Sequence, residues 1–319
     1  MVPPNIGMCF ARTFPAAAVL EVAERLELGG VDQLWVIEDC FYTAGISLAA
    51  TALARTERLA VGIGILPAVA RNPAVTAMEL ATLAELSPGR VIAGIGHGVQ
   101  DWMDQMGART ASPLTTLDEV VTVVRRLLRG ERVTFDGREV HLRDVQLEQP
   151  PAIVPPVLAG VRGPRSLALA GRVADGIVLA EGVGPAAVRW SLEQAGSPDP
   201  FRVSVFSALC VTSVRETAYR IMAPFVASIL ASANPGAAGH PHAADLVELF
   251  ATKGVEGIET MPRSWWLDFG AIGTLDDVVE HVDGLAQAGA HDVAFFPAAQ
   301  IDVALGQIDD IVRVAAALR

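Results

Sequence analysis

Residues 59–98 read LAVGIGILPAVARNPAVTAMELATLAELSPGRVIAGIGHG, and this stretch decides how the chain folds. Two apolar, β-branched runs, Leu59–Ile65 and Arg90–Ile95, have the length of strands buried on both faces. Between them a helix is predicted to begin at Pro73. Its apolar face is predicted from helical spacing to hold Val75, Met78, Thr82 and Leu86, with Glu79 and Glu85 turned elsewhere. This βαβ unit predicts a parallel sheet, and both strands lead into glycines at the carboxyl ends, where α/β enzymes bind ligands.

The composition of the chain favours an acidic enzyme with a large core. Its 319 residues are 51% hydrophobic, enough for one α/β barrel or two ordinary domains. The formal net charge of -12 argues against nucleic acid or an anionic membrane as the main partner, because both require a basic face. An acidic soluble enzyme that acts on a small-molecule substrate is the plain interpretation.

The cysteines and the amino terminus predict a cytoplasmic protein. Cys9, Cys40 and Cys210 have no spacing typical of a disulfide framework or a zinc site. His240 and His242 flank a proline without a third ligand nearby, so no metal site is expected. The first residues lack the basic and apolar segments of a signal peptide, and no apolar run approaches the length of a membrane helix.

The rest of the chain repeats the order of strand and helix about eight times. Residues 131–147 interrupt it with two alternating strands around an Asp-Gly turn, which predicts an inserted antiparallel hairpin. Residues 214–253 are alanine-rich and predict inserted helices near the barrel mouth, broken at Asn234-Pro235-Gly236 and at His240-Pro241. No polar linker divides the chain. We therefore predict a single α/β domain over residues 1–319, a (β/α)8 TIM barrel.

Glycines after the predicted strands are candidates for ligand contact. Gly94, Gly96 and Gly98 either cradle a cofactor with backbone amides or form a tight turn from strand to loop. His97 between them faces either the cavity or solvent. A Rossmann site is disfavoured, because the third glycine of its motif would fall at Val99.

A second candidate site follows the strand that ends at Gly160. Gly163 and Pro164 begin a helix there, and Arg162 and Arg165 flank them. Amides at a helix amino terminus and two guanidinium groups suit a phosphate. The alternative is a pair of solvated surface arginines.

Acidic, thiol and aromatic side chains follow other predicted strands. Asp39 either faces a pocket or serves as a helix cap or ion-pair partner at the barrel rim. Cys40 is expected to be inert, because nothing nearby in sequence would lower its pKa. We predict that a substrate cleft is lined by Phe10, Cys40, Phe41, Gln100 and Trp102. For the three aromatic residues, packing in the core is the alternative.

Several motifs, taken in order, carry a resemblance that covers nearly the whole chain. They are Arg71-Asn72-Pro73, the turn at residues 85–90, Gly-Ile-Gly-His-Gly at 94–98, the hairpin, and residues 160–171 followed by Ala-Asp-Gly at 174–176. Together they resemble the luciferase-like flavin enzyme superfamily, and within it the branch that depends on coenzyme F420 and includes methylenetetrahydromethanopterin reductase.

This resemblance implies a TIM barrel that holds F420, or alternatively FMN, at the carboxyl ends of its strands. It implies a cis peptide bond between Gly64 and Ile65 behind the ring, and a cofactor contact from Asp39. Cys40 stands where some members carry a histidine, which leaves the proton donor unassigned. The cofactor-binding residues implied, together with those argued above, are Asp39, Gly64, Ile65, Leu66, Gly96, His97, Gly98, Val99, Gly160, Val161, Arg162, Gly163, Pro164, Arg165, Ala180 and Glu181.

The implied activity is hydride transfer between reduced F420 and an organic substrate. One alternative is an FMN-dependent monooxygenase fed by a separate flavin reductase, and another is a barrel that binds flavin without catalysis. The resemblance also implies a homodimer with the early helices at its interface, and a cofactor-reducing enzyme is a further possible partner.

Overall fold

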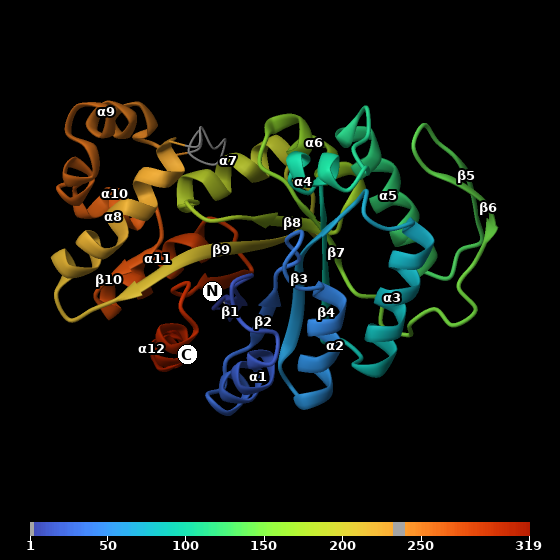
Figure 1. The fold of residues 1–319 in the computed structure, drawn as a ribbon, viewed down its shortest axis with the longest axis horizontal. Helices are drawn as coiled ribbons and strands as arrows, with labels where there is room; N and C mark the ends of the chain where they lie inside the picture. Colours follow the sequence, from blue (N-terminus) through green and yellow to red (C-terminus); the bar gives the residue numbers. More distant parts are fainter. Residues whose placement is uncertain (1–2, 232–239) are drawn as a thin grey trace.

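A computed structural model describes residues 3–231 and 240–319 and shows a closed barrel of parallel strands within a layer of helices (Figure 1). Neighbouring strands pair in the order β1, β2, β3, β4, β7, β8, β9 and β11, and β11 closes the ring on β1. These strands span Asn5–Phe10, Gln33–Val36, Ala60–Pro67, Val91–Gly96, Val157–Gly160, Gly176–Leu179, Arg202–Val211 and Asp292–Phe296. The predicted (β/α)8 barrel is confirmed.

Helices connect the strands and cover the outside of the barrel. The main core lies between the two layers, and a smaller apolar cluster that includes Trp35, Phe206 and Val178 fills the barrel. The helices are α1 Ala18–Leu28, α2 Gly45–Arg55, α3 Pro73–Leu86, α4 Gln100–Gln105, α5 Pro113–Leu128, α6 Pro164–Val173, α7 Pro185–Ala195, α11 Leu275–Gln287 and α12 Ile301–Ala317.

Helix α3 begins at Pro73 as predicted, but the predicted apolar face is wrong. Val75, Met78, Thr82 and Leu86 are exposed, and Ala77, Leu80 and Ala84 are buried instead. The helix carries apolar residues on nearly all sides, so their spacing alone does not determine which side packs inward. The small alanines let α3 approach the barrel and α5 closely, which leaves a ridge of larger side chains on the surface.

The predicted hairpin is present as β5 (Val133–Asp136) and β6 (His141–Val145), which project from the barrel wall beside α5 (Figure 1). Glu119 on α5 fixes its turn. Its carboxylate accepts backbone hydrogen bonds from Arg138 at 2.7 Å and from Glu139 and Val140 at 2.8 Å each. Burial opposes the charge of Glu119, but these hydrogen bonds hold its pKa below the ordinary value.

Replacing Glu119 with glutamine is expected to loosen the hairpin. The amide group of Glu119→Gln would present donors to backbone N–H groups that are themselves donors, a local loss of about 1–3 kcal/mol. Hydrogen exchange of the amides of residues 138–140 should become faster, while Asp118→Asn on the same helix should leave it unchanged. Equal exchange in both variants would contradict this role of Glu119.

A second group of helices packs apart from the barrel layer, at the end of the long strand β9 (Figure 1). It consists of α8 (Arg215–Ala231), α9 (Ala243–Glu259) and α10 (Arg263–Leu267), with the short strand β10 (Ala271–Gly273) paired to β9. The helices predicted at residues 214–253 are present on both sides of residues 232–239. The predicted break at Asn234-Pro235-Gly236 lies outside the described residues. Among the helices described, none is long and apolar enough to cross a membrane.

Candidate functional site

A cavity of about 490 Å³ opens at the carboxyl ends of the barrel strands. The loops after β1, β2, β4, β7 and β8 form its walls, and side chains from inside the barrel form its floor. Its lining residues are Arg12, Ile37, Glu38, Asp39, Cys40, Gly64, Ile65, Pro67, His97, Gly98, Val99, Trp102, Gly160, Val161, Arg162, Gly163, Ser166, Val178, Ala180, Glu181, Phe206 and Phe296. This is the end of the sheet where the sequence predicted a ligand site.

Ile65 forms one side of the cavity and depends on three glycines. A Cβ added at Gly94, Gly96 or Gly160 would lie 3.0, 2.1 or 2.6 Å from its side chain. The peptide bond between Gly64 and Ile65 is cis, as the resemblance implied, and the bond between Cys40 and Phe41 is cis as well. Gly94 and Gly96 therefore make room for Ile65. Of the three glycines at residues 94–98, only Gly98 lines the cavity.

The motif Arg71-Asn72-Pro73 braces the cavity wall from behind. Arg71 binds both carboxylate oxygens of Glu38, at 2.5 and 2.9 Å, and Glu38 also accepts the backbone N–H of Gly45 at 2.7 Å. The side chain of Asn72 caps α3 by accepting the backbone N–H of Ala74 at 2.9 Å. The motif thus fixes the loop after β2 against the start of α3.

Asp39 lies at the rim of the cavity in an ion pair with Arg12, at 2.9 Å. The Arg12 guanidinium also lies 5.0 Å from the ring centre of Tyr42 and 5.6 Å from that of Trp102. The sequence left two alternatives for Asp39, a position facing a pocket or an ion pair at the barrel rim. The structure shows both, because Asp39 pairs with Arg12 and also lines the cavity.

His97 joins the loop after β4 to helix α6. Its Nδ1 lies 3.2 Å from the carbonyl oxygen of Pro113, and its Nε2 lies 3.1 Å from the hydroxyl of Ser166. Only an N–H can bond the carbonyl, so Nδ1 carries the proton and Nε2 accepts from Ser166. Burial lowers the pKa of His97, and the bond to Pro113 opposes this only in part. His97 is therefore neutral and positions α6 beside the cavity.

The start of α6 supplies the most suitable place for an anion. Gly163 precedes Pro164 at the first turn, and a Cβ at Gly163 would meet no atom within 4 Å. The Arg162 side chain is 40% exposed, and its nearest carboxylate partner is Glu181 at 3.9 Å. Arg162 lines the cavity, whereas Arg165 is exposed outside the lining.

The thiols near the cavity are unreactive. Burial raises the pKa of Cys40, and the charges of Glu38 and Asp39 add to the shift. Cys9 is fully buried inside the barrel, and its pKa is raised well above the ordinary value by that burial. Neither is a thiolate near neutral pH.

Some predicted site residues lie elsewhere. Phe10 is fully buried in the main core with its ring 5.3 Å from that of Phe14, and Leu66 is buried in the same core. Phe41 is exposed, and Gln100 donates hydrogen bonds to the carbonyl oxygens of His97 and Gly98. Gly96, Pro164 and Arg165 also lie outside the lining.

The sequence interpretation missed several lining residues. Arg12 and Ser166 follow the carboxyl ends of β1 and β7 within a few residues, and that position was the available signal. Phe206 and Phe296 were missed because a side chain pointing into a barrel has no distinct sequence pattern when its strand is buried on both faces.

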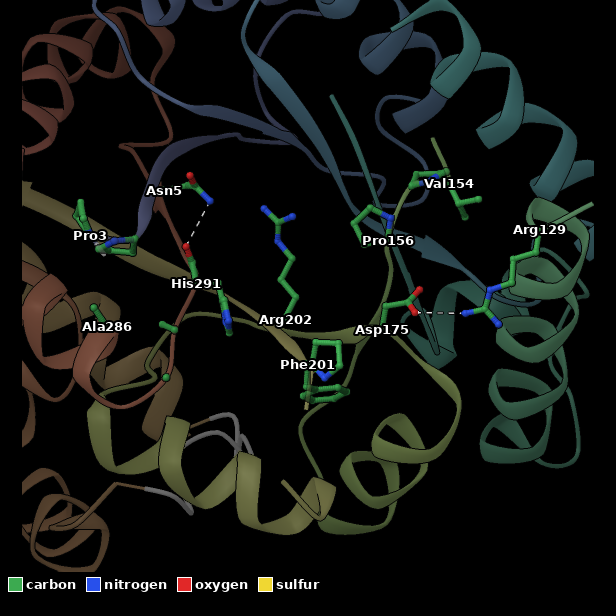
Figure 2. Close-up of a pocket in the computed structure, with 15 residues that line it drawn as sticks. Pro3, Asn5, Arg129, Val154, Pro156, Asp175, Phe201, Arg202, Ala286 and His291 are labelled. Carbon is green, nitrogen blue, oxygen red and sulfur yellow. Dashed lines mark hydrogen bonds and ion pairs between the residues drawn. The ribbon is translucent and has the colours of Figure 1, made fainter. Parts of the chain in front are cut away.

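A larger cavity of about 800 Å³ lies at the opposite, amino-terminal ends of the strands (Figure 2). Its charged groups are paired: Arg129 lies 3.7 Å from Asp175, and Arg202 binds the buried carboxylate of Asp292 at 2.7 and 2.8 Å. Asp175 also accepts the backbone N–H of Val157 at 3.0 Å. These pairs join strands and helices at the base of the barrel, so we assign them a structural role.

The fold and the first cavity define a TIM-barrel protein with a ligand site at the carboxyl ends of its strands. The chain belongs to the luciferase-like monooxygenase family, whose model matches residues 5–292.

Curated relatives include two kinds of enzyme. A 5,10-methylenetetrahydromethanopterin reductase of Archaeoglobus fulgidus is 28% identical over 84% of this chain and 85% of its own. The same kind of enzyme from Methanolobus tindarius is 34% identical over 55% of this chain, and the match spans about half (53%) of that relative. An F420-dependent glucose-6-phosphate dehydrogenase of Intrasporangium calvum is 37% identical over 54% of this chain and 57% of its own.

Solved structures confirm the fold. An F420-dependent secondary alcohol dehydrogenase in complex with an F420-acetone adduct aligns over 100% of both chains with a TM-score of 0.79 and 20% identity. The coenzyme F420-dependent tetrahydromethanopterin reductase of Methanopyrus kandleri aligns over 95% of this chain and 97% of its own, with a TM-score of 0.77 and 20% identity.

Proposed function

We propose that this protein is an F420-dependent oxidoreductase that transfers a hydride between reduced F420 and an organic substrate. The observation that carries the proposal is one cavity that combines an apolar wall at Ile65, an aromatic floor at Phe206 and Phe296, and the Arg162 guanidinium beside Gly163 at the start of α6. One kind of curated relative, the F420-dependent glucose-6-phosphate dehydrogenase, is named for F420, and so are the two solved structures described above.

The residues present fit such a cofactor. A flat ring system requires an apolar wall, and Ile65 supplies one that rests on glycines. A phosphate requires N–H donors and positive charge, which Gly163 at the start of α6 and Arg162 supply. Bound F420 would supply the hydride chemistry, while the chain orients the two reactants and keeps water from the ring.

An FMN-dependent monooxygenase is the second candidate, because the same features suit FMN. Its support is the family itself and neighbours such as an oxygenating Baeyer-Villiger component solved with FMN. The F420 proposal has the stronger support, because the relatives matched in sequence include F420-dependent enzymes.

Titration of the purified protein with F420 and, separately, with FMN distinguishes the two candidates. We expect fluorescence to report micromolar binding of F420 and none of FMN. Arg162→Ala should weaken F420 binding by about ten- to a hundredfold, since a charge-assisted hydrogen bond contributes about 1.5–3 kcal/mol. Arg165→Ala is the matched control and should leave the affinity unchanged. Preference for FMN would contradict the cofactor assignment, and equal losses in both variants would contradict the phosphate site.

We also propose a homodimer formed through α2 and α3. The exposed ridge of Val75, Met78 and Leu86 lies on α3, and the neighbouring α2 exposes small side chains such as Ser47 and Ala54. In the proposed dimer, the exposed apolar side chains of α3 in one copy would be buried against the small side chains of α2 in the other copy. Light scattering should give twice the mass of one chain, and Met78→Lys should give a monomer; a monomeric wild type would contradict the proposal.

A cytoplasmic location is also proposed, with a cofactor-reducing enzyme as a further partner. The cysteines are free, which agrees with a reducing compartment. After F420 has given its hydride to the substrate, the oxidised cofactor must be reduced again. This protein could do so with a second substrate, or another enzyme could supply the reduced cofactor.

A further inference from the structure

The cavity contains three carboxyl groups, and two of them are held by arginines. Glu38 is bound by Arg71 through two hydrogen bonds and accepts the N–H of Gly45. Asp39 is bound by Arg12 at 2.9 Å. Both side chains are therefore held in ion pairs.

Glu181 differs from both. It follows the carboxyl end of β8, lines the cavity, and has a side chain that is 25% exposed there. Within the described residues, no other residue donates it a hydrogen bond, and Arg162 lies 3.9 Å away. The cavity therefore contains one carboxyl group that is free to exchange a proton with a ligand.

Charged and titratable groups surround Glu181 on several sides. Burial, the largest influence, raises the pKa of Glu181, and the negative charge of Asp39 raises it further. Arg162, Arg12 and its own backbone N–H act in the opposite direction and do not cancel the shift. The thiol of Cys9 on β1 lies close to Glu181. Burial and the charge of Glu181 both raise the pKa of Cys9, so Cys9 stays protonated.

The other titratable side chains of the cavity are poor proton donors. The Nδ1 proton of His97 is held by the carbonyl of Pro113, and its Nε2 accepts from Ser166. The Cys40 thiol has a raised pKa, because of its burial and two neighbouring carboxylates. The guanidinium groups of Arg12 and Arg162 do not titrate near neutral pH.

We propose that Glu181 is the group that gives the substrate its proton during hydride transfer. This inference rests on the proposed function. For a substrate with a C=O or C=N bond, the carbon takes the hydride, with both electrons, from reduced F420, and the oxygen or nitrogen takes the proton of the Glu181 carboxyl group. The double bond becomes single, the cofactor leaves oxidised, and Glu181 is left as a carboxylate that regains its proton from water. In the reverse direction, Glu181 accepts the proton.

Infrared difference spectroscopy of the protein without ligand tests the protonation directly. As pH rises from 4 to 8, the wild type should lose the C=O band of a neutral carboxyl group at a pH above that of an ordinary glutamate. Glu181→Gln should lack this band, and Glu148→Gln, at an exposed position, should keep it. A band that persists in Glu181→Gln would overturn the assignment.

Turnover and binding then separate this inference from the proposed function. With reduced F420 and acetone as the probe acceptor, Glu181→Gln should lower turnover about a hundredfold or more. It should also remove the limb of the pH profile that reports the acid. Glu181→Asp should recover part of the rate. F420 affinity should stay within about threefold of the wild type, because glutamine has nearly the shape of glutamate and the proposed ring and phosphate contacts at Ile65, Arg162 and Gly163 are unchanged. An unchanged pH profile with intact binding would overturn the role of Glu181 alone, whereas failure of the wild type to bind F420 would overturn the proposed function.

Discussion

Asp292→Ala is expected to cost about 3–5 kcal/mol of unfolding free energy, because it leaves the guanidinium of Arg202 without its partner at the base of the barrel. The carboxylate of Asp292 is fully buried at the start of β11. It accepts hydrogen bonds from Arg202 at 2.7 and 2.8 Å, and from Ser204, Gln33 and Asn5 at 2.6, 2.7 and 2.8 Å. One side chain thus joins strands β1, β2, β9 and β11.

Urea unfolding followed by circular dichroism checks this value. Asp144→Asn is the control, since Asp144 faces Arg132 at 3.2 Å on the exposed hairpin and such surface pairs contribute about 0–1 kcal/mol. A loss below about 1 kcal/mol for Asp292→Ala would show that the network does not hold the barrel together.

The same carboxylate predicts how stability depends on pH. Burial opposes its charge, but the hydrogen bonds and charge of Arg202, with Ser204 and Asn5, hold the pKa of Asp292 below its ordinary value. Because the pKa of Asp292 is lower in the folded state, its charge stabilises the folded protein at pH values above the unfolded pKa of about 3.9. This contribution is lost as pH falls through the folded pKa, so Asp292→Ala should unfold with a weaker dependence on pH below about 4.

Gly96→Val is expected to lower the affinity for F420 about a hundredfold. The added Cβ would lie 2.1 Å from Cδ1 of Ile65 and 2.8 Å from the backbone oxygen of Gly160. The backbone of Gly160 cannot yield, so Ile65 must move into the cavity. Overpacking of this kind costs about 1–3 kcal/mol, and about 2.7 kcal/mol corresponds to two powers of ten in affinity.

The fluorescence titration proposed above measures the effect, with Gly306→Val as the control. A Cβ at Gly306, on α12, meets no atom within 4 Å, so its substitution should leave binding unchanged. Wild-type affinity in Gly96→Val would mean that Ile65 does not form part of the cofactor site.

Most of the barrel strands could be predicted because each is an apolar run with a glycine or proline at or near one end. The run at Arg202–Val211, for example, was placed within one residue. The orientation of α3 could not be predicted, because the small Ala77 and Ala84 face inward and the larger Met78 faces solvent. The short strand Ala271–Gly273 was missed, because three residues are too few to show the alternation of side chains that identifies a strand.

At the candidate site, sequence position identified the loops but not the partners of each side chain. Arg162 was found because it follows the predicted strand end at Gly160, and Glu181 was found among the residues that the resemblance implied. That Gly96 makes room for Ile65, or that Arg12 pairs with Asp39, depends on contacts between different strands and loops. Such contacts follow from the closure of the barrel, which no local pattern contains.

A crystal structure of the protein with bound F420 tests the central claim most directly. The account predicts the ring against Ile65 in the cavity at the carboxyl ends of the strands, and the phosphate at Arg162 and Gly163. Density for the cofactor in the opposite cavity, between Arg129 and Arg202, or a phosphate away from Arg162, would contradict it.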